Sequence, residues 1–133
     1  MSPNQVDTGY MIIRKVSPWL IELLPPESTP ELETVEIAQK NLEAYLEFIG
    51  DDDNYLLARA PNHHVLPEAR KVYKEAINKV NVKAVAIIAQ GQFKIMVANI
   101  FVSLFSDAPF PIKMFRKRRD AFEWLEQQNT QHL

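Results

Sequence analysis

Val82 to Ala89 (VKAVAIIA) decides the fold class, because this stretch is nearly all apolar and rich in β-branched residues. Such a composition is typical of a strand in a parallel sheet that is covered on both faces. Upstream, Asn54 to Ala60 (NYLLARA) predicts another strand, and the chain from Pro67 to Val80 carries an apolar stripe at helical spacing. Strand, helix and strand in this order predict parallel strands with helices packed on the sheet.

The N-terminal part of the chain predicts a hairpin followed by a helix. Gly9 to Lys15 (GYMIIRK) and Trp19 to Leu24 (WLIELL) are short, apolar segments with turn residues between them. The gap is too short for a helix, so these two strands are expected to pair antiparallel. The helix then ends near Gly50, and Ser28 or Thr29 is expected to cap its start.

The C-terminal part adds a helix over Gly91 to Ser106, a short strand over Ile112 to Phe115, and a final helix capped by Asp120. The order is β-β-α-β-α-β-α-β-α. We therefore expect one α/β domain over all 133 residues, with a mixed sheet of about five strands and about four helices. Met1 to Thr8 and Gln127 to Leu133 are expected to be flexible tails.

Composition and charge exclude several classes of protein. The chain contains no cysteine, so disulfides, thiolate metal sites and thiol catalysis are excluded. The polar start of the chain has no apolar signal core, which predicts a cytoplasmic protein. A net charge of −2 gives no general attraction to nucleic acid. The longest apolar run, Phe93 to Phe105, is too short to span a bilayer.

Several local stretches together match a known pattern. They are the capped helix after Leu24-Pro25-Pro26, the strand Val82 to Ile88, the apolar helix Phe93 to Phe105, and Pro111 to Phe115 followed by Ala121 to Leu125. In these stretches the chain resembles the SpoIIAA-like, STAS-type domains, and in particular a small bacterial branch of stand-alone proteins of unknown function. The resemblance covers most of the chain and implies a SpoIIAA-like fold.

The regulatory members of that family carry a phosphorylated serine after the third strand, and phosphate there breaks a complex with a partner. The matching segment of this chain, Ala60 to Glu68, contains no serine or threonine, and none occurs between Thr34 and Ser103. The resemblance therefore implies partner binding without the phosphorylation switch of the family.

His63 and His64 lie on the expected strand-to-helix loop, where function often resides in α/β folds. One interpretation is an ordinary exposed loop, and the other is a contact with a partner or ligand. A zinc site requires three or four ligands, and no third ligand occurs at a suitable spacing. We expect no metal site and no cofactor.

No pattern of polar residues predicts catalysis. None of the five serines lies in a nucleophile-elbow sequence. The carboxylates of the first expected helix are best interpreted as its solvated face; they are Glu31, Glu33, Glu36, Glu43 and Glu47. No residue is therefore expected to be catalytic.

A basic cluster follows the last expected strand, and its candidate anion contacts are Lys113, Arg116, Lys117 and Arg118. A solvated loop is one interpretation of this cluster, and binding of an acidic partner or a lipid headgroup is the other. The net negative chain and the lack of interleaved aromatic residues argue against nucleic-acid binding.

The expected helix over residues 91–106 is apolar on nearly all sides, which is unusual for a helix that meets water on one face. Deep packing between neighbouring helices is one explanation. The other is an exposed apolar patch that a dimer mate, a protein partner or a lipid covers. The candidate contact residues on this helix are Phe93, Met96, Ile100, Phe101 and Val102.

The sequence thus predicts a non-enzymatic binding or regulatory module that acts through protein–protein contacts or self-association, with a dimer as the expected assembly. The alternative is a small binder or carrier of an apolar, lipid-like ligand that uses the same helix, because flexible Met and aromatic surfaces suit such ligands. An enzyme whose residues converge only in space is the third alternative.

Overall fold

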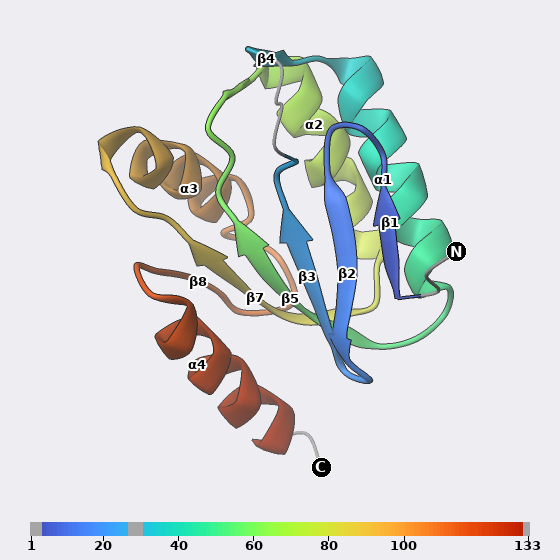
Figure 1. The fold of residues 1–133 in the computed structure, drawn as a ribbon, viewed down its shortest axis with the longest axis vertical. Helices are drawn as coiled ribbons and strands as arrows, with labels where there is room; N and C mark the ends of the chain where they lie inside the picture. The colour runs from blue at the N-terminus through green and yellow to red at the C-terminus, as the bar shows by residue number, and fades with distance from the viewer. Residues whose placement is uncertain (1–3, 27–30, 132–133) are drawn as a thin grey trace.

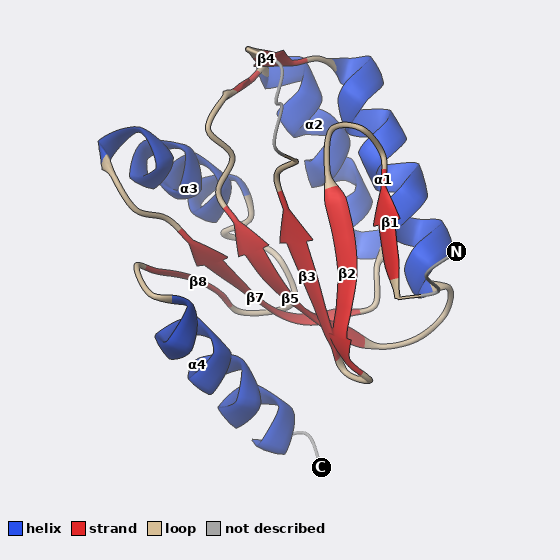
Figure 2. Cartoon of the chain, in the orientation of Figure 1, coloured by secondary structure: helices blue, strands red, loops and turns tan. Residues whose placement is uncertain are grey.

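The computed structural model describes residues 4–26 and 31–131, which form a mixed sheet with helices on both faces (Figures 1 and 2). The strands of this sheet are β1 (Gln5–Asp7), β2 (Ile12–Ser17), β3 (Leu20–Leu24), β5 (Asn54–Arg59), β7 (Val82–Ile88) and β8 (Ile112–Phe115). They lie side by side in the order β1-β2-β3-β5-β7-β8. The pairs β1–β2 and β2–β3 are antiparallel, and the remaining pairs are parallel.

The helices are α1 (Val35–Ile49), α2 (Pro67–Ala76), α3 (Gln92–Leu104) and α4 (Arg118–Gln131), and a short 3-10 turn, η1 (Ile77–Lys79), follows α2. The first three helices lie on one face of the sheet, and α4 lies alone on the other (Figure 1). The predicted hairpin and the predicted parallel strand over residues 82–88 are therefore confirmed, as is the α/β class.

Each face of the sheet carries its own hydrophobic cluster. Successive side chains of a strand point to opposite faces, so Val85 and Ile87 of β7 face α1 and α3, whereas Ala84 and Ala86 face α4. The small alanines leave room for α4 to pack closely on the sheet. The buried members under α4 are Leu20, Tyr55, Leu57, Ala84, Ala86, Ala121 and Leu125.

Both segments that the sequence predicts to be flexible tails carry secondary structure over the residues that the structure describes. Within the predicted N-terminal tail, β1 pairs with β2 and brings the sheet to six strands instead of about five. All three of its residues are exposed, so no apolar pattern marks this strand. At the other end α4 continues to Gln131, because Leu125 anchors it in the core and the Thr130 hydroxyl donates to the Glu126 carbonyl. Residues 1–3 and 132–133 lie outside the described residues.

The start of α1 also differs from the prediction. The predicted caps Ser28 and Thr29 lie outside the described residues, and the cap of α1 is Thr34, whose hydroxyl oxygen accepts from the Ile37 amide at 3.4 Å. Before this cap, β4 (Leu32–Glu33) pairs in parallel with β6 (His64–Val65). The segment expected to be the first turn of the helix is thus an extended ribbon, and it positions Glu33 as described below.

We expect Thr34→Ala to lower the free energy of unfolding by about 1 kcal/mol, because one amide of the first turn of α1 loses its acceptor. Thr34→Ser, which keeps the hydroxyl, is the control and should change stability by much less. Urea denaturation followed by circular dichroism measures both. Equal losses in the two variants would show that the side-chain methyl group, rather than the cap, stabilises this end of the helix.

Candidate functional site

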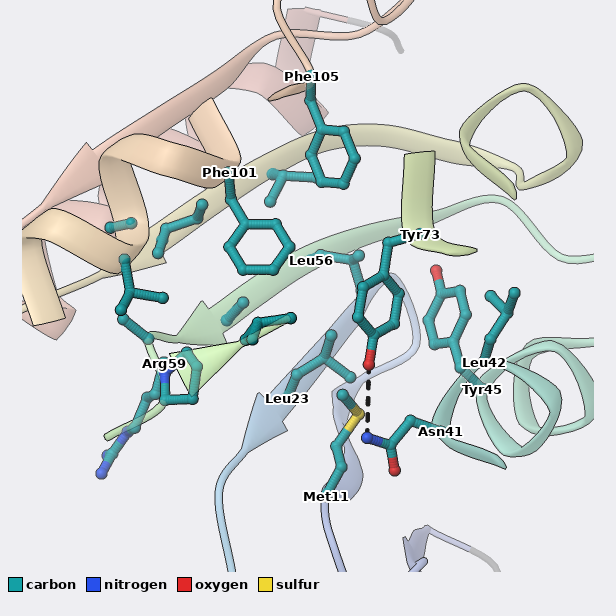
Figure 3. A pocket seen from close by; sticks show the side chains of 18 of the residues that line it. Met11, Leu23, Asn41, Leu42, Tyr45, Leu56, Arg59, Tyr73, Phe101 and Phe105 are labelled. Carbon is teal, nitrogen blue, oxygen red and sulfur yellow. Dashed lines mark hydrogen bonds between the residues drawn. The ribbon is translucent and has the colours of Figure 1, made fainter. Parts of the chain in front are cut away.

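An apolar pocket of about 220 Å³ lies between the sheet and the layer formed by α1, α2 and α3 (Figure 3). Leu23 of β3 and Leu56 of β5 line it from the sheet, and Phe101 and Phe105 line it from α3. Tyr45 of α1 closes the opposite side. An apolar cavity of about 150 Å³ is sufficient to hold benzene, so this space accommodates a somewhat larger apolar molecule.

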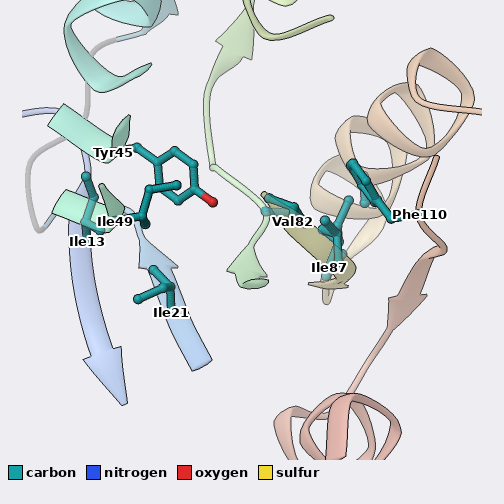
Figure 4. Packing of buried hydrophobic residues seen from close by; sticks show 11 residues of the cluster. Ile13, Ile21, Tyr45, Ile49, Val82, Ile87 and Phe110 are labelled. Carbon is teal, nitrogen blue, oxygen red and sulfur yellow. The ribbon is translucent and has the colours of Figure 1, made fainter. Parts of the chain in front are cut away.

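The pocket borders the hydrophobic cluster on this face of the sheet (Figure 4). Ile13, Ile21 and Tyr45 of this cluster lie beneath α1, and Val82 and Phe110 lie toward α3. Tyr45, Val82 and Phe110 line the pocket, so residues from both ends of the cluster contribute to its wall.

One end of the pocket is polar, and side chains from distant parts of the chain form it; Glu33, Asn41 and His63 among them are buried. Nε2 of His63 lies 2.8 Å from Oε1 of Glu33, and the Tyr73 hydroxyl donates to the other oxygen of Glu33. The side-chain amide nitrogen of Asn41 donates to the Tyr73 hydroxyl at 3.5 Å. The Thr8 hydroxyl donates to the side-chain oxygen of Asn41 at 2.7 Å. The polar end is thus a continuous chain of hydrogen bonds beside an apolar space.

Tyr45 and Tyr73 of the pocket remain protonated at all physiological pH values. Burial raises the pKa of Tyr73, and the charge of Glu33 and the hydrogen bond to Glu33 raise this pKa further. Burial also raises the pKa of Tyr45, although its hydroxyl donates to Asn54 at 2.6 Å. Tyr73 therefore acts as a hydrogen-bond donor to Glu33.

A second polar cluster lies on the α4 face of the sheet, around the fully buried Glu22 of β3. Arg14 of β2 donates to this carboxylate, and Arg118 at the start of α4 donates through Nε at 3.2 Å and Nη2 at 3.4 Å. Nε of Arg59, at the end of β5, lies 3.9 Å from the same carboxylate. Burial raises the pKa of Glu22, but the hydrogen bonds and charges of Arg118 and Arg14 outweigh burial and hold this pKa below its usual value.

The structure separates the two histidines that the sequence singles out. His63 is buried against Glu33, so the interpretation of an ordinary exposed loop is wrong for this residue. The burial arises because β6 pairs with β4 and carries the adjacent Glu33 inward. His64 is exposed, and its ring meets the edge of Phe93 at a centroid distance of 5.0 Å. The sequence predicts Glu33 on a solvated helix face, and this prediction is also wrong. Glu33 lies in β4, the short strand before α1, and is buried.

The predicted contact residues of α3 point in different directions. Phe101 lines the pocket, and Val102 packs against the hydrophobic cluster on this face of the sheet. Met96 is 46% exposed and borders a shallow surface groove together with Ile100 and Arg70. Only Val97 and Ala98 are fully buried on this helix. The helix therefore contributes to the pocket wall and also leaves apolar side chains at the surface, and a protein partner for that surface stays a prediction.

The predicted basic cluster is also divided. α4 begins at Arg118, before the predicted cap Asp120, and Arg118 therefore projects onto Glu22 instead of lying in a solvated loop. The Arg116 carbonyl accepts from the side chain of Gln90 at 2.7 Å, while Lys117 is exposed. The Lys113 ammonium lies 5.3 Å from the centre of the Phe115 ring. Arg118 is thus the member of the cluster that has a defined polar partner inside the fold.

Sequence reasoning missed the residues that organise both clusters, although two of them left a signal. Asn41 interrupts the apolar stripe of α1, since it lies three residues after the buried Ala38 and four before the buried Tyr45. Glu22 interrupts a strand whose neighbours are otherwise apolar. A polar residue at a position that periodicity assigns to the core indicates a buried partner. Tyr73 carried no such signal, because a tyrosine fits an apolar stripe.

Two general findings limit what the site can be. Over residues 4–26 and 31–131, no group of three or more His, Cys, Asp or Glu side chains is arranged to hold a metal ion. Within the same residues, no helix has both the length and the apolar character needed to cross a membrane.

The strand order and the helices on both faces of the sheet define a SpoIIAA-like α/β fold. A solved structure with this fold, an uncharacterized protein of the DUF3478 family from Shewanella loihica PV-4, is similar over 86% of this chain and 91% of that chain, with 20% sequence identity and a TM-score of 0.56. The predicted resemblance to SpoIIAA-like domains is confirmed at the level of the fold.

The chain belongs to the family described as Domain of unknown function (DUF7793), whose model matches residues 29–129. No curated protein matches the sequence.

Proposed function

We propose that this protein binds a small, largely apolar molecule in the pocket between the sheet and α1, α2 and α3. The pocket itself supports this proposal most strongly, because it has the apolar lining of a ligand site with few polar groups at one end. The ligand would have an apolar body and one hydrogen-bonding group. The polar group would lie near Glu33, His63 and Tyr73, where the protein has its own hydrogen-bonding atoms.

The polar end of the pocket favours ligand binding without catalysis. Each oxygen of Glu33 already accepts one hydrogen bond from the protein, from His63 and from Tyr73, which holds the carboxylate toward these two side chains. A general base must lie within hydrogen-bond reach of the proton that it removes. We therefore propose that these residues recognise and orient a ligand rather than transform it.

We place small-ligand binding ahead of protein–protein contact because the pocket lies between the sheet and the helices of the domain. The aromatic side chains of α3 that the sequence analysis singled out contribute to it through Phe101. A partner at the outer surface of α3 would leave the pocket unexplained, whereas a ligand in the pocket accounts for both the missing packing and the polar end.

Titration with 2-naphthol tests the proposal, because this molecule is neutral at pH 7 and combines an apolar ring system with one hydroxyl group. We expect saturable binding by isothermal titration calorimetry. Ala58→Phe should weaken this binding by about tenfold or more, since Ala58 lines the pocket from the same face of β5 as Leu56 and a phenyl ring would fill the space.

Leu56→Ala is the matched control, because it enlarges the same pocket and should preserve binding of the probe. Thermal denaturation of both variants confirms that they fold. Absence of binding to the wild-type protein, or equal binding to the wild type and to a folded Ala58→Phe variant, would contradict the proposal.

A further inference from the structure

We infer that Arg14, Arg59 and Arg118 form a binding site for a phosphate group on the α4 side of the sheet. Glu22 points to the face opposite the apolar pocket, because it is a neighbour of the pocket-lining Leu23 on β3, whereas Arg59 lies at the edge of the sheet and borders both the pocket and Glu22. The inference rests on Glu22 and its arginines and not on the function proposed for the pocket.

The first argument is charge. Three guanidinium groups surround one buried carboxylate, so the cluster holds two more positive charges than negative ones. One or two arginines would satisfy the hydrogen-bonding capacity of a carboxylate. A third arginine brings like charges together and adds no benefit to the ion pairs of Glu22 with the other two. An anion from outside would relieve the repulsion among the three groups.

The second argument is geometry. The side chains of Arg14, Arg59 and Arg118 are 42%, 49% and 43% exposed, so each reaches from the buried carboxylate to the solvent. A guanidinium has five N–H donors; Glu22 accepts from one donor of Arg14 and two of Arg118, and Nε of Arg59 lies 3.9 Å away from it. The remaining donors are available to an incoming anion. Glu22 thus holds the side chains of Arg14 and Arg118 in place, which lowers the entropy cost of binding.

The third argument is position. Arg59 is the last residue of β5, and Arg118 is the first residue of α4, immediately after the loop that leaves β8. Ligands of open α/β sheets bind beyond the carboxyl ends of the parallel strands, and Arg59 lies at that edge. The exposed Lys117 adds positive charge beside Arg118. Arginine forks match the oxygens of phosphate in a bidentate manner, so a doubly charged phosphate fits this site better than a carboxylate does.

The test uses the full chain in chloride buffer, with inorganic phosphate, glycerol phosphate and acetate as probes in isothermal titration calorimetry. We expect both phosphates to bind and acetate not to bind. Arg59→Gln should weaken phosphate binding by about tenfold, since it removes one charge-assisted interaction. Arg59 is the residue to replace, because it lies farthest from Glu22 among the three arginines and its loss should perturb the fold least.

Lys71→Gln is the matched control, since Lys71 is an exposed residue of α2 paired with Glu75 and should not affect phosphate binding. Vesicles of phosphatidylcholine with and without phosphatidic acid separate the two sources of phosphate. Binding to soluble phosphate assigns a free ligand, and binding only to phosphatidic acid vesicles assigns a lipid headgroup. No binding in either arm, or equal loss in Arg59→Gln and Lys71→Gln, would overturn the inference.

Discussion

Leu57→Ala is expected to lower the free energy of unfolding by about 3 to 4 kcal/mol, which corresponds to a drop in melting temperature of roughly 10 °C or more. Leu57 is fully buried under α4, where it packs with Leu20 and Leu125 in the cluster on that face. Truncation removes three carbon atoms from a fully buried position, so a cavity remains. Chemical denaturation followed by tryptophan fluorescence measures the loss.

Leu56→Ala provides the comparison, because Leu56 is the same residue type at the adjacent position of β5 and points to the opposite face. It is partly buried and already borders the pocket, so its removal should cost only about 1 to 2 kcal/mol. The difference between the stability losses of Leu57→Ala and Leu56→Ala measures how unevenly the two faces of the sheet are packed. Equal losses would show that the pocket side is as tightly packed as the α4 side.

Glu22→Gln is expected to destabilise the protein by about 2 kcal/mol at neutral pH. The substitution keeps the shape of the side chain but removes the charge that Arg14, Arg59 and Arg118 share. The expected loss is below that of a fully buried ion pair, because all three arginines reach the solvent and water screens their charges. Glu123→Gln, at an exposed position of α4, is the control and should change stability little.

The effect of Glu22→Gln should depend on pH in a defined direction. The pKa of Glu22 in the folded state lies below its usual value of 4.5, so the ionised carboxylate stabilises the fold at any pH above that value. This stabilisation is lost as the pH falls from about 4.5 through the lowered pKa of the folded state. Denaturation curves of the wild type and the variant should therefore converge in acid. A constant difference down to pH 3 would contradict the assignment.

The fold was largely predictable because it depends on periodic features. Val82 to Ala89 indicated a strand buried on both faces, and the short gap between β2 and β3 indicated an antiparallel hairpin; both are confirmed. What the sequence did not reveal was β1, whose three exposed residues have no apolar pattern. Its pairing depends on the neighbouring β2 rather than on its own composition.

The candidate sites were less predictable, because their members come from distant segments. His63 drew attention, but its partner Glu33 lies 30 residues away and looked like one of several helix-face carboxylates. Arg118 was predicted as an anion contact, whereas Glu22, which orients it, lies 96 residues away. Such pairs arise from strand order and helix placement, and the sequence of a single chain does not encode them in any local pattern.

The structure partly explains why α3 is apolar on nearly all sides. The sequence analysis offered deep packing or an exposed patch, and the helix contains both kinds of residue. Phe101 faces the pocket, and Met96 faces the solvent. A helix that borders an internal space on one side needs apolar residues there even though they are not tightly packed, which widens its apolar face beyond that of an ordinary surface helix.

The pairing of β4 with β6 also determines when the polar end of the pocket comes into existence during folding. Glu33 and His63 become neighbours only after α1 has crossed the sheet and β5 has been added beside β3. Contacts between segments this far apart require a large loop to close, so they form late relative to helices and hairpins. A fragment that begins at β5 would lack β4 and therefore half of this ribbon. The polar end of the pocket is in this sense a property of the completed chain and not of one segment.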